Sequence, residues 1–199
     1  NDGSLTRRPA GQTEDTTSWS YPDPEWMLGV TTIIDGIPDH TARVITYTSQ
    51  EFDEEREFTG HGVLVLHGSS DQTDMDVIVK VQVLTPSAQG FKARKVTQGW
   101  LRASHRAEDP NLTQDMLPFH THDKIDPLTP GKVYELRVEL LPMSFLVREG
   151  ERLRLEISNF DSLIADAPMT HWYGQKVGTD TYHHDAAHPS RLVLPHCPR

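Results

Sequence analysis

The stretch Val133–Phe160 reads VYELRVELLPMSFLVREGERLRLEISNF, and it decides the fold class. In both halves of this stretch, apolar residues alternate with charged ones. A period of two places the apolar side chains on one face of a strand and the charged side chains in water. Pro142 interrupts the first run, and Gly150 lies in the turn before the second. The stretch predicts two strands of an antiparallel sheet that is covered on one side only.

Shorter runs of strand-like sequence follow one another from residue 42 onward. Val63–Leu66 is apolar on both faces, which favours a central strand, and Gly99 suggests a bulge or bend. Ala107–Pro130 is polar and rich in proline and predicts a long loop, and Asp161–His184 predicts a second irregular segment. The predicted strands outside the opening stretch are Ala42–Thr48, Glu57–His67, Met75–Leu84, Phe91–Ala103 and Arg191–Leu194.

The composition agrees with a β architecture rich in loops. Only 36 % of the 199 residues are hydrophobic, and the chain holds 14 prolines and 13 glycines. Short strands, long crossovers and no βαβ alternation indicate an all-β fold, a jelly-roll β-sandwich of the galactose-binding-domain-like type. Residues 1–40 predict an extended arm that packs on the domain or its partner, and residues 41–199 predict the sandwich itself.

Charge and hydropathy narrow the range of partners. The net charge of -10 argues against nucleic acid or an anionic membrane surface as a partner. No apolar run is long enough to span a bilayer. No signal peptide is visible, and the missing Met predicts a processed or cut N-terminus. The single Cys197 cannot form an internal disulfide. A single cysteine fits a reducing compartment and also a secreted domain, so we expect a cytoplasmic location and leave a secreted or periplasmic one open.

We find no catalytic motif in the sequence. The G-x-S-x-G elbow of α/β-hydrolases is missing. His67–Asp71 (HGSSD) gathers suitable residue types, but neighbours in a tight turn cannot relay a proton in triad geometry. We read this segment as a polar turn between strands. Nearby, Asp71, Asp74 and Asp76 are expected to cap a turn or to pair with Lys80 or Arg102.

Eleven histidines raise the question of a metal site. The densest groups are His120–Asp123 (HTHD) and His183–Asp185 (HHD), with His171 and His188 near the second. An H-x-H strand edge supplies two ligands in cupin-type barrels. Here the flanking sequence lacks the defined Glu and the third His at a set distance. We therefore expect exposed loop histidines, no metal and no cofactor.

Several segments resemble, in order, the motifs of one known domain. The opening Asp2–Leu5 (DGSL) is similar to the D-G-S-L that begins that domain. The other segments are Asp74–Val81 (DMDVIVKV, similar to D-T-D-F-x-A-K-L), Gly99–Ala103 (GWLRA, D-G-I-L-R-A-R), Pro130–Glu135 (PGKVYE, P-G-x-x-Y-x), Gly150–Phe160 (GERLRLEISNF, G-H-R-I-R-L-E-V-S-S-S-N-F) and His184–Pro195 (HDAAHPSRLVLP, H-D-x-x-H-P-S-x-L-V-L-P). The chain resembles the C-terminal jelly roll shared by Xaa-Pro dipeptidyl-peptidases, cocaine esterase and α-amino-acid ester hydrolases.

The resemblance implies a function. In that family an N-terminal α/β-hydrolase domain carries the Ser-Asp-His triad, and the jelly roll packs beside it and helps to shape the substrate pocket. It implies that this chain is the non-catalytic domain of a serine hydrolase, a dipeptidyl-peptidase or an acyl esterase, with the triad outside the chain. The implied partners are the hydrolase domain of the same gene product and a small ester, amide or peptide substrate, and the oligomeric state stays open.

By the same resemblance, Trp26, Met27 and Leu28 are expected to line the pocket or the domain interface. Their apolar character on a loop agrees with that role. The segment 161–170 departs from the family's P-x-x-D-R-N-x-N-T-G.

Two alternatives remain at this point. One is a carbohydrate-binding jelly roll, for which Trp100, Trp172 and Tyr173 are the candidate aromatics. The other is a metal-dependent, cupin-like enzyme that uses the histidine-rich loops.

Overall fold

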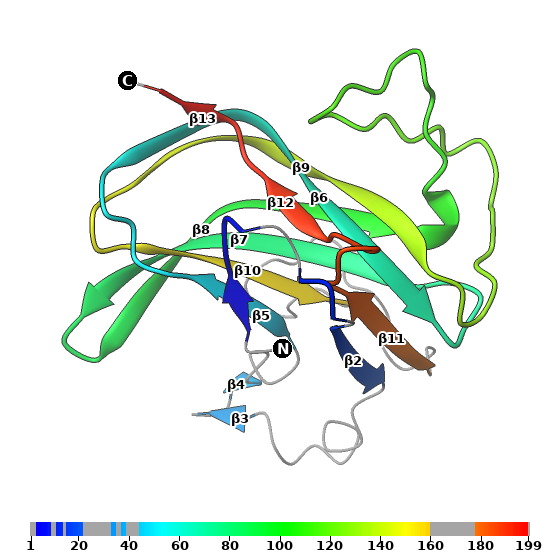
Figure 1. The fold of residues 1–199 in the computed structure, drawn as a ribbon, viewed down its shortest axis with the longest axis horizontal. Helices are drawn as coiled ribbons and strands as arrows, with labels where there is room; N and C mark the ends of the chain where they lie inside the picture. The colour runs from blue at the N-terminus through cyan, green and yellow to red at the C-terminus, as the bar shows by residue number, and fades with distance from the viewer. Residues whose placement is uncertain are drawn as a thin grey trace.

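The computed structural model describes residues 3–8, 11–13, 15–21, 33–34, 37–38, 44–159 and 178–198. Two β-sheets pack face to face across these residues (Figure 1). One short 3-10 turn, η2 (Ala103–His105), interrupts the strands, and the described ranges contain no α-helix. Within this part of the chain, no helix has the length and hydrophobicity needed to cross a membrane. The predicted all-β sandwich is confirmed.

The first sheet has five strands in the order β1-β5-β10-β7-β8. Its neighbouring strands run antiparallel, apart from β1 and β5, which run parallel. The bounds are Ser4–Leu5 for β1, Ile45–Ser49 for β5, Arg152–Ser158 for β10, Asp76–Ser87 for β7 and Gly90–Arg102 for β8.

The second sheet is organised around β6 (Arg56–Ser70), as the two-sided apolar run Val63–Leu66 predicted. This strand pairs along its length with β9 on one side, and on the other side with β11, β12 and β13 in turn. The outermost strand, β2, pairs with β11, and β3 forms a separate small hairpin with β4. The bounds are Tyr134–Val147 for β9, Gly178–His183 for β11, Arg191–Val193 for β12, His196–Cys197 for β13, Thr16–Tyr21 for β2, Ile33–Ile34 for β3 and Ile37–Pro38 for β4.

The core lies between the two sheets. The alternate valines of β7 point into it, as their period of two predicts, and so do the alternate apolar residues of β9. Burying each of these side chains contributes roughly 1.5–3 kcal/mol. The fully buried members, with 0 % exposure, are Val77, Val79, Val81, Val83, Leu136, Val138 and Leu140.

The prediction that the two halves of the opening stretch are strands of one sheet is wrong. β9 pairs with β6 in the second sheet, whereas β10 lies between β5 and β7 in the first. The turn between them therefore crosses from one sheet to the other, so that both apolar faces meet the same core. Glu151 holds this turn by accepting hydrogen bonds from Arg148 N–H at 2.8 Å and from Thr85 Oγ1 at 2.6 Å.

Pro142 does not end its strand. β9 continues through it to Val147, and the pairing with β6 shifts register between Gly60 and Gly62. Proline is tolerated at such a bulge because no ladder hydrogen bond is lost there. The bulge predicted near Gly99 lies three residues earlier in β8, at Val96, because Thr97 pairs with Val81 and Lys95 pairs with Gln82.

Gly99 serves a different purpose, which is the close approach of the two sheets. An added Cβ there would overlap the carbonyl oxygen of Glu139 on β9 and lie 3.2 Å from Cδ2 of Leu140. Beside it, the Thr97 hydroxyl donates to the carbonyl oxygen of Leu141 at 2.7 Å. The two sheets are thus joined along β8 and β9 by a contact that only glycine permits.

Among the strands that were not predicted, the two longest are β2 and β11, which pair with each other. Gly178–His183, which was expected to belong to an irregular segment, forms β11. Both strands are rich in Thr and Ser and have few apolar residues, so their alternation is weak, although Tyr182 is fully buried. The predicted long loop is present between Ala107 and Pro130.

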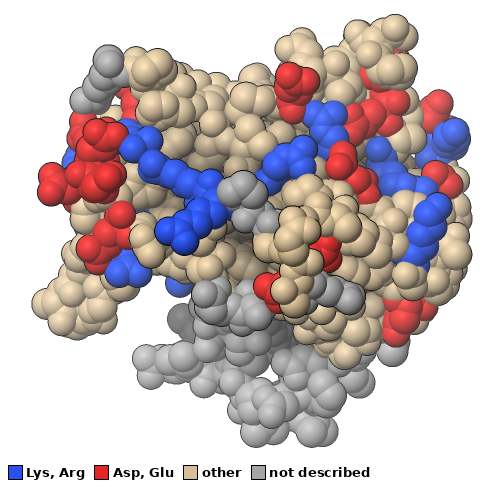
Figure 2. Space-filling model, viewed as in Figure 1, with Lys and Arg blue, Asp and Glu red and all other residues tan. Residues whose placement is uncertain are grey.

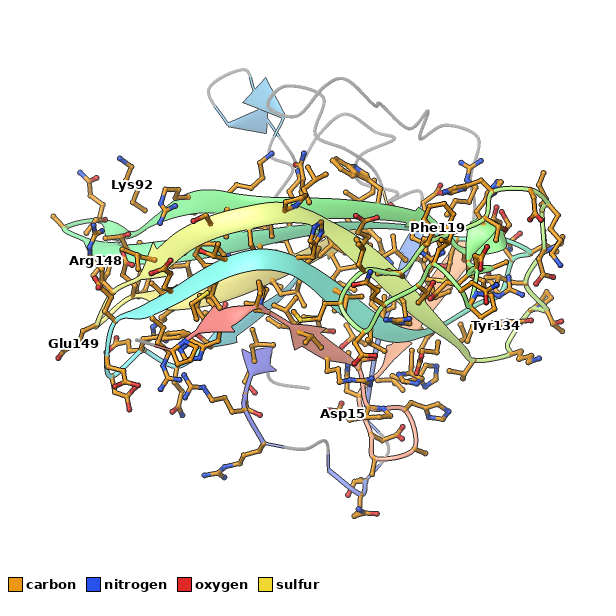
Figure 3. All side chains as sticks on the ribbon, turned by 90° about the horizontal axis from the view of Figure 1, so that it is seen from above. Asp15, Lys92, Phe119, Tyr134, Arg148 and Glu149 are labelled. Atoms are coloured by element: carbon orange, nitrogen blue, oxygen red, sulfur yellow. The ribbon has the colours of Figure 1, made fainter. Side chains whose placement is uncertain are left out.

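Charged side chains are mixed over the surface. On the face drawn in Figure 2, Lys and Arg form a short band across the middle, with Asp and Glu gathered on both sides of it. In Figure 3, Phe119 and Tyr134 lie at one end of the sandwich, and Lys92, Arg148 and Glu149 lie at the other.

Candidate functional site

The turn that follows β11 is built by the sequence HDAAHPS. Oδ1 of Asp185 accepts hydrogen bonds from the backbone N–H groups of Ala187 at 2.8 Å and His188 at 2.9 Å. Ser190 then fastens the turn to two strands. Its hydroxyl donates to the carbonyl oxygen of His183 at 2.7 Å and accepts from the backbone N–H of His67 at 2.8 Å. The motif is therefore a staple that joins β6, β11 and the start of β12.

Five polar side chains gather at this staple, and we call them the His183 cluster. Ser69 Oγ and His183 Nε2 lie 3.1 Å apart, and Nδ1 of His188 lies 3.3 Å from Oδ2 of Asp185. The ring centroids of His183 and His188 are 5.2 Å apart, and those of His67 and His188 are 5.7 Å apart. β6 supplies His67 and Ser69, β11 supplies His183, and the turn supplies Asp185 and His188.

Burial sets the charge state of the cluster. It lowers the pKa of His67, and nearby His188 adds to this, although Glu135 Oε2, 3.5 Å from Nε2, acts in the opposite direction. Burial alone would raise the pKa of Asp185, but hydrogen bonds from His188 and from two backbone N–H groups hold it below its usual range. The cluster therefore pairs a neutral His67 with an ionised Asp185 at neutral pH.

His184, on the same turn, points away to a second contact. Its Nε2 lies 2.8 Å from the hydroxyl of Tyr47, which also donates to Thr17 Oγ1 at 3.1 Å. Burial lowers the pKa of His184. Its backbone N–H donates to the carbonyl oxygen of Asp15, which Figure 3 shows outside the sandwich, beside this segment. His184 therefore ties the first sheet to the N-terminal strand β2.

The cluster does not form a catalytic triad. Ser69 is only 8 % exposed, so little of its surface is open to a substrate. The Asp185 carboxylate is directed to His188 and to the backbone of its own turn. The expectation that residues 67–71 form a turn is also wrong, because His67 through Ser70 belong to β6.

The expectation of exposed loop histidines is wrong for several of them. His183 lies in β11 and is half-buried. His120 and His188 are also half-buried, although neither lies in a strand. His120 Nε2 donates to the carbonyl oxygen of Arg137 at 2.9 Å, and its ring lies 6.1 Å from that of His122. Of the described residues, only His183, Asp185 and His188 form a set whose ligand atoms all lie within 4.8 Å of one another.

Asp74 and Asp76 make the contacts that the sequence predicted, a turn cap and an ion pair with Arg102. Asp76 forms an ion pair with Arg102 at 2.9 Å, as predicted. Asp74 Oδ1 accepts from the N–H groups of Met75 at 3.0 Å and Ser104 at 2.9 Å, and it thereby caps η2. Their role is structural.

The other candidate residues are placed as follows. Trp26, Met27 and Leu28 lie outside the described residues, as do Trp172 and Tyr173. Trp100 is on β8 and is half-buried.

A surface pocket lies at the opposite end of β9 from the His183 cluster. It holds no Ser-His pair. Its lining residues are Glu57, Arg94, Ser144, Phe145, Leu146 and Arg148.

Comparison with known proteins decides the family. Residues 3–193 match the family described as the X-Pro dipeptidyl-peptidase C-terminal non-catalytic domain. The chain belongs to this family. Over 163 residues it is 32 % identical to proteins of Mycobacterium bovis and Mycobacterium tuberculosis that are named as predicted serine esterases. The match covers 77 % of this chain but only 24 % of each relative, so the chain spans about a quarter of their length.

Solved structures show the same fold. A CocE/NonD family hydrolase from Staphylococcus aureus superposes with a TM-score of 0.77 at 19 % identity, over 99 % of this chain and 35 % of that one. An aminopeptidase from a Thaumarchaeota archaeon of marine sediment gives 0.67 at 17 % identity, over 98 % of this chain and 35 % of the other. An α-amino acid ester hydrolase gives 0.65 at 19 % identity, with the same coverage of 98 % and 35 %. In each case the chain corresponds to about a third of a larger protein.

Proposed function

We propose that this chain is the accessory domain of a serine hydrolase and packs beside an α/β-hydrolase domain of the same gene product. The match of residues 3–193 to a family of non-catalytic domains carries this proposal. The Ser-His pair in the described residues supports it, because Ser69 is buried and lacks the accessibility of a nucleophile. The triad would then lie in the part of the protein that this chain does not cover, which makes up about three quarters of the length of the relatives.

The proposed reaction of the whole protein is acyl transfer through an acyl-enzyme on the serine of that other domain. The substrate class is a small ester, an amide or an X-Pro peptide. We propose that Trp26, Met27 and Leu28 present apolar side chains to this substrate or to the hydrolase domain. Such a loop would contribute binding and orientation, and the chemistry would stay with the triad.

Hydrolysis by two forms of the protein tests this proposal. An X-Pro p-nitroanilide and a p-nitrophenyl ester would be given to the 199-residue chain and to the full gene product. We expect turnover by the full product alone, and its loss after treatment with a serine-directed inhibitor. Turnover by the 199-residue chain would overturn the proposal, and so would turnover by the full product that the inhibitor leaves intact.

A substitution tests the loop separately. Trp26→Ala in the full product is expected to raise KM about tenfold, which corresponds to about 1.4 kcal/mol of lost binding. Phe91→Ala serves as the matched control, because Phe91 is 49 % exposed in the hairpin between β7 and β8. Equal effects of the two substitutions on KM would contradict the role given to Trp26.

A further inference from the structure

The His183 cluster contains three metal-ligating side chains from the end of a strand and the turn that directly follows it. His183 lies at the end of β11, and Asp185 and His188 lie in the turn after it. One ligand atom from each of them lies within 4.8 Å of the others. Oδ1 of Asp185 accepts the two backbone hydrogen bonds that cap the turn. Oδ2 accepts neither of these bonds and faces Nδ1 of His188.

The hydrogen bond between Asp185 and His188 is long, and its length also suits two ligands of one ion. Nδ1 of His188 lies 3.3 Å from both carboxylate oxygens of Asp185. Hydrogen bonds between charged nitrogen and oxygen groups are usually about 2.7–2.9 Å long. In a tetrahedral zinc site with bonds of about 2.0–2.2 Å, neighbouring ligand atoms lie about 3.3–3.5 Å apart. The spacing of the pair therefore also suits two ligands of one ion, and the ligand atom of His183 lies within 4.8 Å of both.

The neighbouring His67 gives a second, independent indication of a ligand at this cluster. His67 is only 9 % exposed, and its ring packs against that of His188. Its Nδ1 has no hydrogen-bond partner among the described residues, which is costly for a buried polar atom. Water bound to an ion in the cluster would give such an atom a partner. Ser69 stands on the other side of the cluster, with its hydroxyl 3.1 Å from His183 Nε2.

We propose that His183, Asp185 and His188 bind one divalent transition-metal ion of the zinc class, and that this ion fastens the turn after β11 to the second sheet. Two imidazoles and one carboxylate suit Zn²⁺ and its neighbours and disfavour Ca²⁺ and Mg²⁺, which prefer oxygen ligands only. Three protein ligands leave a fourth position for water. The test of this metal site does not depend on the proposed hydrolase function.

Zinc titration of the full gene product tests the proposal. Isothermal titration with ZnCl₂, together with elemental analysis after dialysis, is expected to show one equivalent that His183→Ala and His188→Ala each weaken by at least about tenfold. The full product is compared with its own variants, so zinc that binds elsewhere in the protein contributes equally to each measurement and does not affect the difference between them. With free Zn²⁺ at about 100 times the Kd, the melting temperature should rise, and EDTA should reverse the rise.

Two further variants keep the test decisive. Asp185→Asn retains an oxygen for the backbone cap, so it should fold and yet lose zinc affinity. His122→Asn is the control, because His122 belongs to the other histidine group and Asn tolerates its positive φ of 50°. The proposal is overturned if zinc does not bind, if His188→Ala binds it as well as the wild type, or if His122→Asn weakens it equally. Binding of CaCl₂ in preference to ZnCl₂ would overturn the assigned class of metal.

Discussion

Replacement of Gly99 by alanine tests the account of how the two sheets are joined. Alanine in a strand normally stabilises by about 0.4–1 kcal/mol relative to glycine, because the unfolded chain loses freedom. At Gly99 the sign should reverse. The new Cβ would overlap the carbonyl oxygen of Glu139, lie 3.0 Å from its carbonyl carbon and lie 3.2 Å from Cδ2 of Leu140. The obstacle is backbone of the facing strand, which cannot rotate away, so β8 and β9 would have to separate.

We expect Gly99→Ala to cost about 3 kcal/mol, at the upper end of the range for overpacking. For a chain of this size that lowers the melting temperature by roughly 6–12 °C. The assay is urea unfolding followed by circular dichroism. Gly11→Ala is the matched control, because a Cβ at Gly11 meets nothing within 4 Å, and its effect should stay within about 0.5 kcal/mol. A loss below about 1 kcal/mol at Gly99 would refute the close contact of β8 with β9.

Two further predictions concern the hydrogen bonds of turns. Ser190→Ala removes the hydroxyl that joins β6 to β11 and should cost about 1–3 kcal/mol in urea unfolding. Ser144→Ala, at an exposed site, is the control and should cost less than about 0.5 kcal/mol. Glu151 has its pKa below the ordinary 4.5 because the hydrogen bonds it accepts outweigh its burial. A lowered pKa in the folded state means that this stability is complete above pH 4.5 and is lost as the pH falls through the folded-state pKa. Glu151→Gln should flatten the fall in unfolding free energy below pH 4.5, and an unchanged slope would show that this carboxylate does not carry the effect.

The sequence predicted the fold class because the central strands alternate strongly. The alternate valines of β7 lie in the core between the two layers, together with Leu64 and Leu66 of β6. Val63 and Val65 are buried as well, on the opposite face of β6. Pairing was harder to predict. Alternation places side chains on faces but does not name the neighbouring strand, so β9 and β10 were expected in one sheet and lie in two. β2 and β11 were missed because their pairing partners, rather than apolar residues of their own, keep them in place.

The candidate site was only partly visible in the sequence. The resemblance at His184–Pro195 singled out the turn, and Asp185 and Ser190 explain why its residues belong together. Ser69 reaches His183 from 114 positions away in the chain, and no local pattern signals that distance. Trp26 and its neighbours were chosen from their apolar character and the family resemblance, and their role stays a prediction.

The central claim is that this chain contributes no nucleophile. Labelling of the full gene product with a fluorophosphonate, followed by digestion and mass spectrometry, locates the reactive serine directly. We predict a single labelled serine outside the 199 residues of this chain. A label on Ser69, or on any other serine of this chain, would contradict the account.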